Sequence, residues 1–323
     1  MQRRKLLPMG LLVSALAAQP LWAQDNYPSR AVRIVVPYPA GSSTDLVARA
    51  VAEKLARKWG QSVVIENKPG AAGNLGTQFV ANAPPDGYTL VTGTVANAIS
   101  ASLYKGQLKH DFAKDFEAVA LFSSTPLAMV ANPSAPFDNV RQLIAYARKY
   151  PGRVNYGSGG NGTSTHLSGV MLGSMAGIEL VHVPYKGATA ATADLIGGQI
   201  QIMFDSLVAT LPNVKAGRMK ILGVTTKERS AAAPDVPAIG ETLPGFEALG
   251  WQGLNAPAGT PPAIVEKINR DVVEALKSPD LRQLFAPTGA VLAGGSTADY
   301  KRFIDEEIAK WADVVKRAGA SAN

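Results

Sequence analysis

The stretch VVPYPAGSSTD (residues 35–45) decides the fold, because it joins the end of a predicted strand to the start of a predicted helix. Residues 32–36 form an almost continuous apolar run, which is typical of a buried parallel strand. Ser42-x-x-Asp45 has the form of a capping box, and the apolar residues that follow recur at helical spacing. Such a loop directs the free N–H groups of the first helical turn towards one point, which favours an anion.

A second stretch of the same kind, NYGSGGNGTS (residues 155–164), lies far from the first in the sequence. It follows a strand expected at residues 154–156 and precedes a helix that carries Leu167, Val170 and Met171 on one face. Ligands bind at the carboxyl ends of strands in open α/β sheets. We therefore expect the two loops to be half-sites that close on one small anion.

The length and composition indicate a two-domain globular α/β protein. The chain has 323 residues, of which 46% are apolar and 18% are charged, and this length exceeds that of one ordinary core. It contains no cysteine, which excludes disulfides, thiol catalysis and cysteine metal sites. Its three histidines, His110, His166 and His182, show no metal-binding spacing, so we expect no metal and no cofactor.

The N-terminus has the pattern of an export signal. Arg3, Arg4 and Lys5 precede a short apolar run at residues 6–18, and we expect cleavage near Ala23. The run is too short to span a membrane, so we expect the mature protein to be exported, with Sec or twin-arginine export both open.

The charge of the chain argues against nucleic acid as a partner. Removing the three basic residues of the signal lowers the net charge from +7 to +4. The chain has no run of five basic residues, so no nucleic-acid surface is predicted. The small positive charge mildly favours an anionic ligand.

Strands and helices alternate along the remaining sequence. Further strands are expected at residues 62–66, 88–92, 127–131, 180–183, 200–204, 221–225 and 250–256, and further helices at about 74–81, 140–147, from Pro261 or Pro262, and 297–317. The segments ANPSAP (131–136) and APAGTP (256–261) resemble each other, and each precedes a helix. We expect the chain to cross between lobes near residue 125 and to return near 248. The predicted organisation is a signal peptide at 1–23, lobe 1 at 24–124 plus 249–323, and lobe 2 at 125–248.

Two enzyme hypotheses arise from the second loop. GSGGNG (157–162) satisfies the dinucleotide-binding pattern, but Glu179 precedes the next strand instead of ending it, as that pattern would require. A secreted α/β hydrolase using Ser158 and His166, with Asp205, remains an alternative, although no G-x-S-x-G elbow is present.

Ordered motifs recur beyond the two loops: ENKPGAAGN (66–74), PDGYTL (85–90), VPYKG (183–187), FDS (204–206) and APAGTP (256–261). With the loops, they make almost the whole mature chain similar to the solute receptors of tripartite tricarboxylate transporters, the Bug family of periplasmic binding proteins. One departure is Ala40-Gly41-Ser42, where the family usually has two adjacent glycines. We expect the protein's own specificity at this place.

The resemblance implies a two-lobed receptor of the type II-like Venus-flytrap form, with two open mixed sheets flanked by helices and a hinge of crossing strands. It implies a monomer, not an enzyme, that captures a di- or tricarboxylate or an aromatic acid and delivers it to membrane permease subunits. The ligand carboxylate would be held between the two loops, and Asp205 would meet its distal end. From the sequence itself, the loop Tyr185-Lys186-Gly187 could place a phenol and an ammonium over a cleft, which makes Lys186 the one cation expected near a carboxylate, although a solvated loop lysine is the commoner outcome. The expected ligand-binding residues are Tyr38, Pro39, Ala40, Gly41, Ser42, Ser43, Thr44, Asp45, Gly157, Ser158, Gly159, Gly160, Asn161, Gly162, Thr163, His166, Tyr185, Lys186 and Asp205.

Overall fold

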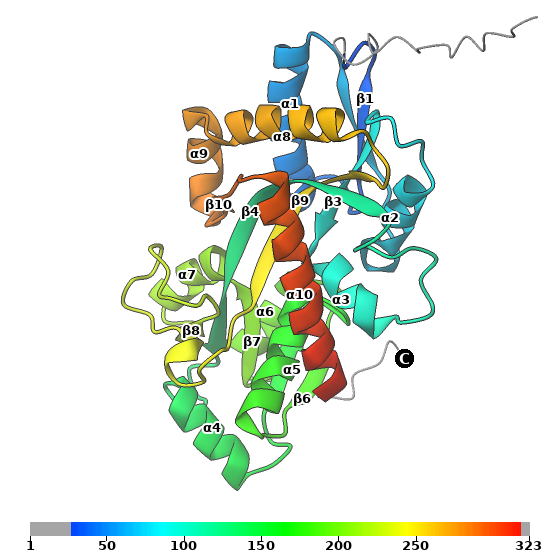
Figure 1. Cartoon of the computed structure of the whole chain (residues 1–323). Coiled ribbons are helices and arrows are strands. Elements are labelled where there is room, and N and C mark those ends of the chain that lie inside the picture. Colours follow the sequence, from blue (N-terminus) through cyan, green and yellow to red (C-terminus); the bar gives the residue numbers. More distant parts are fainter. Residues whose placement is uncertain (1–26, 318–323) are drawn as a thin grey trace, which may run out of the picture.

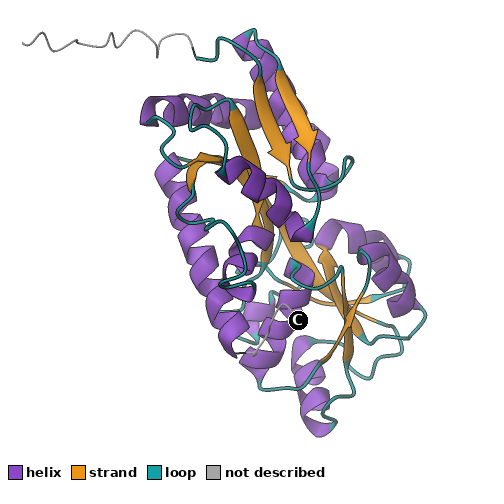
Figure 2. Ribbon diagram, turned by 90° about the vertical axis from the view of Figure 1, so that its right-hand side faces the viewer, coloured by secondary structure: helices purple, strands orange, loops and turns teal. Residues whose placement is uncertain are grey.

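The computed structural model describes residues 27–317, and the predicted signal segment at 1–23 lies outside them. Strands and helices alternate and form two groups of strands flanked by helices (Figures 1 and 2). The strands are β1 (Val32–Val36), β2 (Val63–Asn67), β3 (Thr89–Thr94), β4 (Phe116–Ala131), β5 (Asn155–Ser158), β6 (Val181–Pro184), β7 (Ile202–Ser206), β8 (Lys220–Val224), β9 (Leu249–Pro257) and β10 (Val291–Leu292).

Helices lie between most of these strands. They are α1 (Ser43–Trp59), α2 (Asn74–Ala81), α3 (Val95–Leu103), α4 (Val140–Lys149), α5 (Ser164–Ala176), α6 (Ala188–Ile196), α7 (Leu207–Lys215), α8 (Pro262–Leu276), α9 (Pro279–Phe285) and α10 (Thr297–Arg317), with short 3₁₀ segments η2 (Ala71–Gly73), η3 (Ile239–Glu241) and η4 (Ala286–Thr288). The predicted strand and helix starts around both glycine-rich loops agree with these bounds to within two or three residues.

The strands are hydrogen-bonded in the order β2-β1-β3-β9-β4-β7-β5-β6, and β8 and β10 pair with β4. Parallel pairs flank β1 and β5, whereas β4 and β9 run antiparallel to their neighbours. The sheet is therefore mixed, as expected. Its two halves are not separate, since both include β4.

Strand β4 connects the two halves of the molecule. Its residues Phe116–Pro126 pair with β9, whereas Leu127–Ala131 pair with β7 and mostly also with β8. Only this second part was predicted from the sequence. The partner of β4 thus changes at Pro126 and Leu127, where the strand leaves one half and enters the other.

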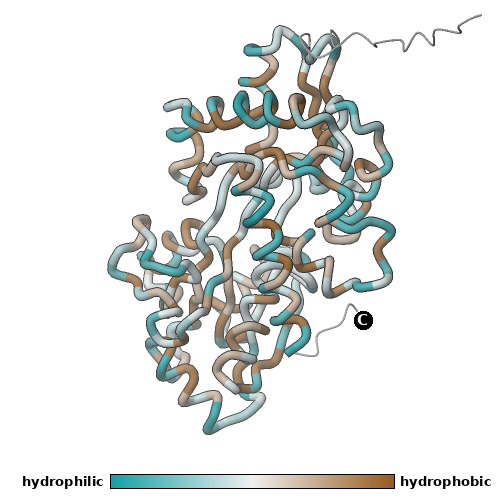
Figure 3. Tube along the Cα trace, viewed as in Figure 1, coloured by the Kyte–Doolittle hydropathy of each residue, from teal (hydrophilic) through white to brown (hydrophobic). Residues whose placement is uncertain are grey.

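Helix α10 also extends over both halves, because it packs on α3 near the first half and on α5 in the second (Figure 1). Hydrophobic and hydrophilic residues alternate along the helices and strands (Figure 3), and one buried cluster includes Ile99 of α3, Leu172 of α5 and Trp311 of α10. Another cluster joins β1 and α1 to α8 and α9. The two halves are therefore linked by one long strand and one long helix.

Candidate functional site

A cavity of about 630 Å³ lies where the two halves meet. That volume is within the usual range for sites that bind small molecules. Both halves contribute to its lining, which consists of Tyr38, Ser42, Ser43, Thr44, Leu46, Val47, Thr94, Val95, Ala96, Thr125, Leu127, Thr163, Ser164, Thr165, Asp205, Ser206, Val208, Ala209, Gly250, Trp251, Gln252, Phe285, Pro287 and Ala290.

Four helices begin at this cavity: α1, α3, α5 and α7 each contribute first-turn residues to the lining. A helix N-terminus carries a partial positive charge and N–H groups without intrahelical acceptors. No Lys, Arg or His is among the described residues that line the cavity, and Asp205 is its only charged side chain. The positive potential of the site therefore comes from the backbone.

The first loop presents its N–H groups through a capped helix start. The hydroxyl of Ser42 accepts a hydrogen bond from the N–H of Asp45, at 3.3 Å. The N–H groups of Ser43 and Thr44, the first two residues of α1, have no acceptor within residues 27–317. These two donors are free for a ligand.

The buried side chain of Asp45 stabilises the conformation of this loop. Its carboxylate, which is 1% exposed, accepts hydrogen bonds from the N–H of Gly41, from Arg49 and from Asn67, at 2.8–2.9 Å. Burial acts to raise the pKa of Asp45, but these hydrogen bonds outweigh it and the pKa lies below its usual value. Asp45 is thus an ionised support of the loop, outside the lining.

The second loop is built in the same way with different side chains. The hydroxyl of Thr163 accepts from the N–H of His166 at 3.2 Å and donates to the carbonyl of Gly160 at 2.7 Å. The N–H groups of Ser164 and Thr165 have no acceptor among the described residues. Ser164 and Thr165 line the same cavity as Ser43 and Thr44.

Stacked aromatic rings support this second loop. The rings of His166 and His182 stack with centroids 4.0 Å apart, and Tyr156 stacks on His182 at 4.9 Å. Burial lowers the pKa of both histidines to about 4, and His182 adds to the effect on His166. Both imidazoles are therefore neutral at pH 7, and Nδ1 of His166 accepts a hydrogen bond from the N–H of Gly162.

The hydrolase alternative finds no support in this arrangement. Ser158 is fully buried and its hydroxyl bonds His182, at 2.7 Å, and not His166. Asp205, near the end of β7, is part of the cavity lining, whereas Ser158 lies outside that lining. A buried hydroxyl cannot reach a substrate in the cavity.

The crossing strands form the floor of the cavity. Gln252 is 7% exposed, donates to the hydroxyl of Ser123 at 3.0 Å, and leaves its Oε1 without a partner in the described structure. Buried polar atoms are nearly always hydrogen-bonded, so this atom points to a partner supplied by a ligand or by water. Its neighbour Trp251 donates to the buried carboxylate of Glu307 on α10, at 2.8 Å.

The structure brings six of the predicted site residues to the cavity: Tyr38, Ser42, Ser43, Thr44, Thr163 and Asp205. Burial raises the pKa of Asp205, although the N–H of Ser206 donates to its carboxylate. The others lie outside the lining: Pro39, Ala40, Gly41, Asp45, Gly157, Ser158, Gly159, Gly160, Asn161, Gly162, His166, Tyr185 and Lys186. Ala40 and Lys186 are exposed, and Tyr185 donates to Asp194 at 2.7 Å.

Sequence reasoning missed the residues at the starts of α3 and α7, the crossing strands and the wall formed by Phe285, Pro287 and Ala290. Thr94-x-x-Asn97 is the one available signal, since Thr94 and Asn97 form a capping box at α3. Thr94 also bonds the hydroxyl of Tyr38, at 2.7 Å, which ties α3 to the first loop.

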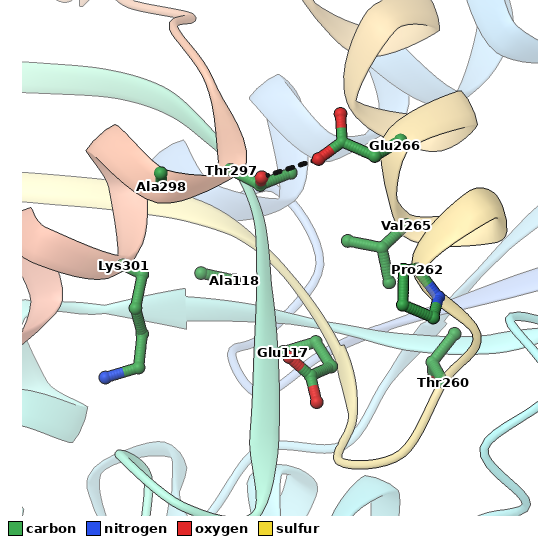
Figure 4. A pocket seen from close by; sticks show the side chains of 9 residues that line it. All are labelled: Glu117, Ala118, Thr260, Pro262, Val265, Glu266, Thr297, Ala298 and Lys301. Carbon is green, nitrogen blue, oxygen red and sulfur yellow. Dashed lines mark hydrogen bonds between the residues drawn. The ribbon is translucent and has the colours of Figure 1, made fainter.

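A second, smaller cavity of about 270 Å³ lies between β4, α8 and α10 (Figure 4). Glu117, Glu266 and Lys301 line it, and Glu266 accepts a hydrogen bond from Thr297. The lining of this smaller cavity carries both acidic and basic side chains. Its residues come from one half of the molecule and from α10, so closure of the two halves would not enclose a ligand there. The junction cavity is therefore the better candidate site.

Residues 27–317 contain neither a membrane-spanning helix nor a metal-binding cluster. No helix there is long and apolar enough to cross a membrane. No group of three or more acidic or histidine side chains in the same range could hold a metal ion.

Comparison with known proteins places these features in a family. The family described as tripartite tricarboxylate transporter family receptor matches residues 47–320. Protein BugT of Bordetella pertussis is 32% identical over 98% of this chain and 98% of its own length. The predicted resemblance is confirmed.

Solved structures agree with this assignment. A protein of R. palustris solved with adipate has a TM-score of 0.78 and 36% identity, covering 91% of this chain and 99% of its own. The periplasmic binding protein BugD gives 0.75 and 33%, over 91% and 99%. MatC from Rhodopseudomonas palustris, with bound malate, gives 0.76 and 33%, over 90% and 100%. The predicted fold of a two-lobed periplasmic binding protein is confirmed.

Proposed function

Because the chain belongs to the family of tripartite tricarboxylate transporter receptors, we propose that it captures a small organic carboxylate in the junction cavity and delivers it to a membrane permease. The observation that carries this proposal is the meeting of four helix N-termini at a cavity whose described lining has no cationic side chain. Hydrogen bonds from N–H groups to a carboxylate are charge-assisted and strong. The bound acid can still be released, since no ion pair with a cationic side chain has to be broken.

The same geometry supports closure of two lobes around the ligand. We assign β4 up to Pro126 to the first lobe and β4 from Leu127 to the second, which is close to the predicted boundaries. Ser43 and Thr44 then belong to one lobe and Ser164 and Thr165 to the other. A ligand bonded by both pairs gains contacts only when the lobes are together, and that differential affinity is what drives closure.

The family and the predicted signal segment support a periplasmic location and membrane permease subunits as partners. In our proposal the protein binds its ligand there as a monomer, passes it to the permease, and catalyses no reaction. The relatives solved with adipate and malate support an organic acid as the ligand.

The direct test measures binding to the purified mature protein by calorimetry and thermal shift. The panel contains mono-, di- and tricarboxylates, with neutral sugars and amines as controls. We expect stabilisation by at least one carboxylate without turnover. Stabilisation by the controls alone, or hydrolysis of an ester that is lost in Ser158→Ala, would contradict the proposal.

Variants can test the backbone donors themselves. Proline at the first position of a helix removes one N–H without disturbing the helix. Ser42 and Thr163 have ψ of 159° in both loops, which a following proline accepts. Ser43→Pro and Ser164→Pro should each weaken carboxylate binding by about 1.5–3 kcal/mol, the value of a hydrogen bond to a charged group. Ser43→Ala and Ser164→Ala keep the N–H and are the matched controls.

A further inference from the structure

We propose that Glu307, a buried residue of α10 outside the lining of the junction cavity, is a positioning residue for ligand binding, because its carboxylate holds the indole of Trp251 in the cavity floor. This inference rests on the proposed function and deepens it, since it names a residue that sets the affinity for the bound acid without touching it. It comes from three features of the structure: the place of Trp251, the hydrogen bonds of Glu307, and the contacts of α10 with the second half.

Trp251 lies where the chain crosses between the two halves. It stands opposite Ser124 of β4, two residues before Pro126, where the pairing of β4 with β9 ends. Trp251 is 3% exposed, and it lines the cavity together with Gly250 and Gln252. A tryptophan ring is large and rigid, so the direction in which it points decides how much of the cavity floor is filled. The shape of the binding site therefore depends on what fixes this indole.

The carboxylate of Glu307 fixes the indole through its only hydrogen-bond donor. Nε1 of Trp251 donates to Oε2 of Glu307 at 2.8 Å, and Nε1 of Trp311 donates to the same oxygen at 3.0 Å. The ammonium group of Lys310 pairs with the other oxygen, Oε1. Glu307 is 3% exposed, and a carboxylate this buried is kept in a protein only where donors and an opposite charge compensate it. Two indoles and one ammonium do so here, and they define the position of the carboxylate.

Two aromatic rings of α10 pack against the same indole. The rings of Tyr300 and Phe303 meet that of Trp251 nearly edge-on, at centroid distances of 6.3 and 5.4 Å. They lie on the same face of α10 as Glu307, about two turns and one turn before it. Without the carboxylate, the indole N–H would be buried with no acceptor, which is unfavourable. The ring would then turn towards water in the cavity and take up space that a bound acid needs.

The same carboxylate connects the cavity floor with the second half of the molecule. Trp311, its other indole partner, is fully buried in the cluster that includes Leu172 of α5. Beside it, Val314 of α10 and Met171 of α5 line a common small cavity, where α10 passes over the second half (Figure 1). A movement of the second half against α10 therefore acts on the helix segment that carries Glu307. Closure of the lobes and the shape of the cavity floor are coupled through this residue.

The experiment measures by calorimetry the affinity of the mature protein for succinate, adipate, malate, citrate and benzoate, and then the affinity of variants for the tightest-binding of these acids. Glu307→Met has a side chain of similar length without an acceptor, and it should bind about tenfold more weakly. Glu307→Gln keeps one oxygen, which can accept from both indoles as Oε2 does, so its affinity should lie within about twofold of the wild type. If Glu307→Gln binds as weakly as Glu307→Met, the bond to the indole does not set the affinity and the inference is overturned.

Tyr300→Phe is the matched control on the same helix. It removes a buried hydrogen bond to Oδ1 of Asn255 on β9, at 3.1 Å, and Asn255 lies outside the cavity lining. Tyr300→Phe and Glu307→Met should both lower the free energy of unfolding in urea, but only Glu307→Met should weaken binding. Equal weakening in the two variants, or none in either, would show that Glu307 is structural alone.

Tryptophan fluorescence reports the indole directly. The emission maximum should move to longer wavelength in Glu307→Met, because the indole of Trp251 reaches water, and should stay in place in Glu307→Gln and Tyr300→Phe. If Glu307→Met does not fold, Glu307→Asp takes its place, since it keeps the charge but withdraws the carboxylate by one methylene, and it should weaken binding about threefold with the same change in emission. Wild-type affinity and emission in that variant would overturn the inference and leave the proposed function standing. Absence of binding of all five acids, and of the wider panel, to the wild type would overturn the proposed function itself.

Discussion

The two glycine-rich loops present the same group in the same way but are supported by different chemistry. In each, a hydroxyl caps the helix, and the first two N–H groups are left free. Beneath the first loop lies the ionised carboxylate of Asp45 with Arg49 and Asn67. Beneath the second lies a stack of neutral rings, with His166 and His182 at its centre.

The N–H groups that face the ligand are therefore the same in both loops, although the residues that support the loops differ. The N–H groups of both loops do the binding, whereas the supports decide how each loop responds to substitution and to acid. The stability of the first loop depends on the hydrogen bonds to the charged Asp45. The stability of the second depends on His166 and His182 remaining unprotonated.

Removing the charge of Asp45 should have the largest effect. Asp45→Asn replaces one of the two acceptor oxygens by an NH₂ group that faces other donors, so hydrogen bonds to a buried charged group, worth about 1.5–3 kcal/mol each, are lost. We expect a loss of about 3 kcal/mol in the free energy of unfolding, measured with urea, and weaker ligand binding. Arg49 is half exposed, so Arg49→Gln should cost less than about 1 kcal/mol. Equal losses in the two variants would contradict the role of Asp45 as the centre of the support.

The glycines of the two loops should differ in their tolerance of a side chain. Gly160 has φ of 123°, and a Cβ there would lie 3.3 Å from the carbonyl oxygen of Tyr185. Gly41 has φ of 81° with open space around it. We expect Gly160→Ala to cost about 2–3 kcal/mol and Gly41→Ala about 1 kcal/mol, the usual range for backbone strain at positive φ. Thermal unfolding of both variants measures these losses of stability. A larger loss for Gly41→Ala than for Gly160→Ala would contradict the prediction.

The side chain of Thr163 should matter to stability, whereas the side chain of Ser43 should not. Thr163 caps α5 and bonds Gly160, and loss of such a cap costs about 1 kcal/mol. Ser43 is exposed, with no side-chain hydrogen bond among the described residues. Thr163→Ala should therefore lower the free energy of unfolding by about 1 kcal/mol, and Thr163→Ser should restore most of it. Ser43→Ala should leave unfolding unchanged, and a measurable loss there would show that its hydroxyl is structural.

Much of the fold and one part of the site could be predicted from the sequence. The apolar run of β1 and the Ser42-x-x-Asp45 pattern placed the first loop at a strand end and a helix start, because these signals are local. The second loop was found in the same way. Six residues of the two loops and of β7 line the cavity, as the pattern suggested for neighbours at strand ends.

The rest of the site could not be predicted, because its signals are weak or long-range. Helix α3 (VANAISASL) is short and consists mostly of apolar or small residues, so its large apolar residues Val95, Ile99 and Leu103 do not contrast with a charged face. Helix α7 contains Pro212. The first part of β4 contains Ser123, Ser124 and Thr125, which break its apolar run. That these segments meet at one cavity follows from the crossing of β4 and β9, which no local pattern encodes.

The supports of the two loops should also respond differently to pH. The pKa values of His166 and His182 fall from 6.5 to about 4 on folding, since burial disfavours their charged forms. The unfolded chain therefore binds more protons between these values, so the stability due to the neutral rings is complete above about pH 6.5 and is lost as pH falls towards 4. Asp45 has a pKa below 3.8 in the folded protein, so its contribution is complete above that value and is lost only as pH falls further.

Unfolding temperatures measured from pH 7 to pH 4 should therefore fall in the wild type and fall less in His166→Asn/His182→Asn, which cannot be protonated. His110, whose pKa is also lowered by burial, is the matched control: His110→Asn should retain the part of the decrease that belongs to the second loop. A profile of the double variant that follows the wild type would show that the ring stack does not confer the acid sensitivity of this loop.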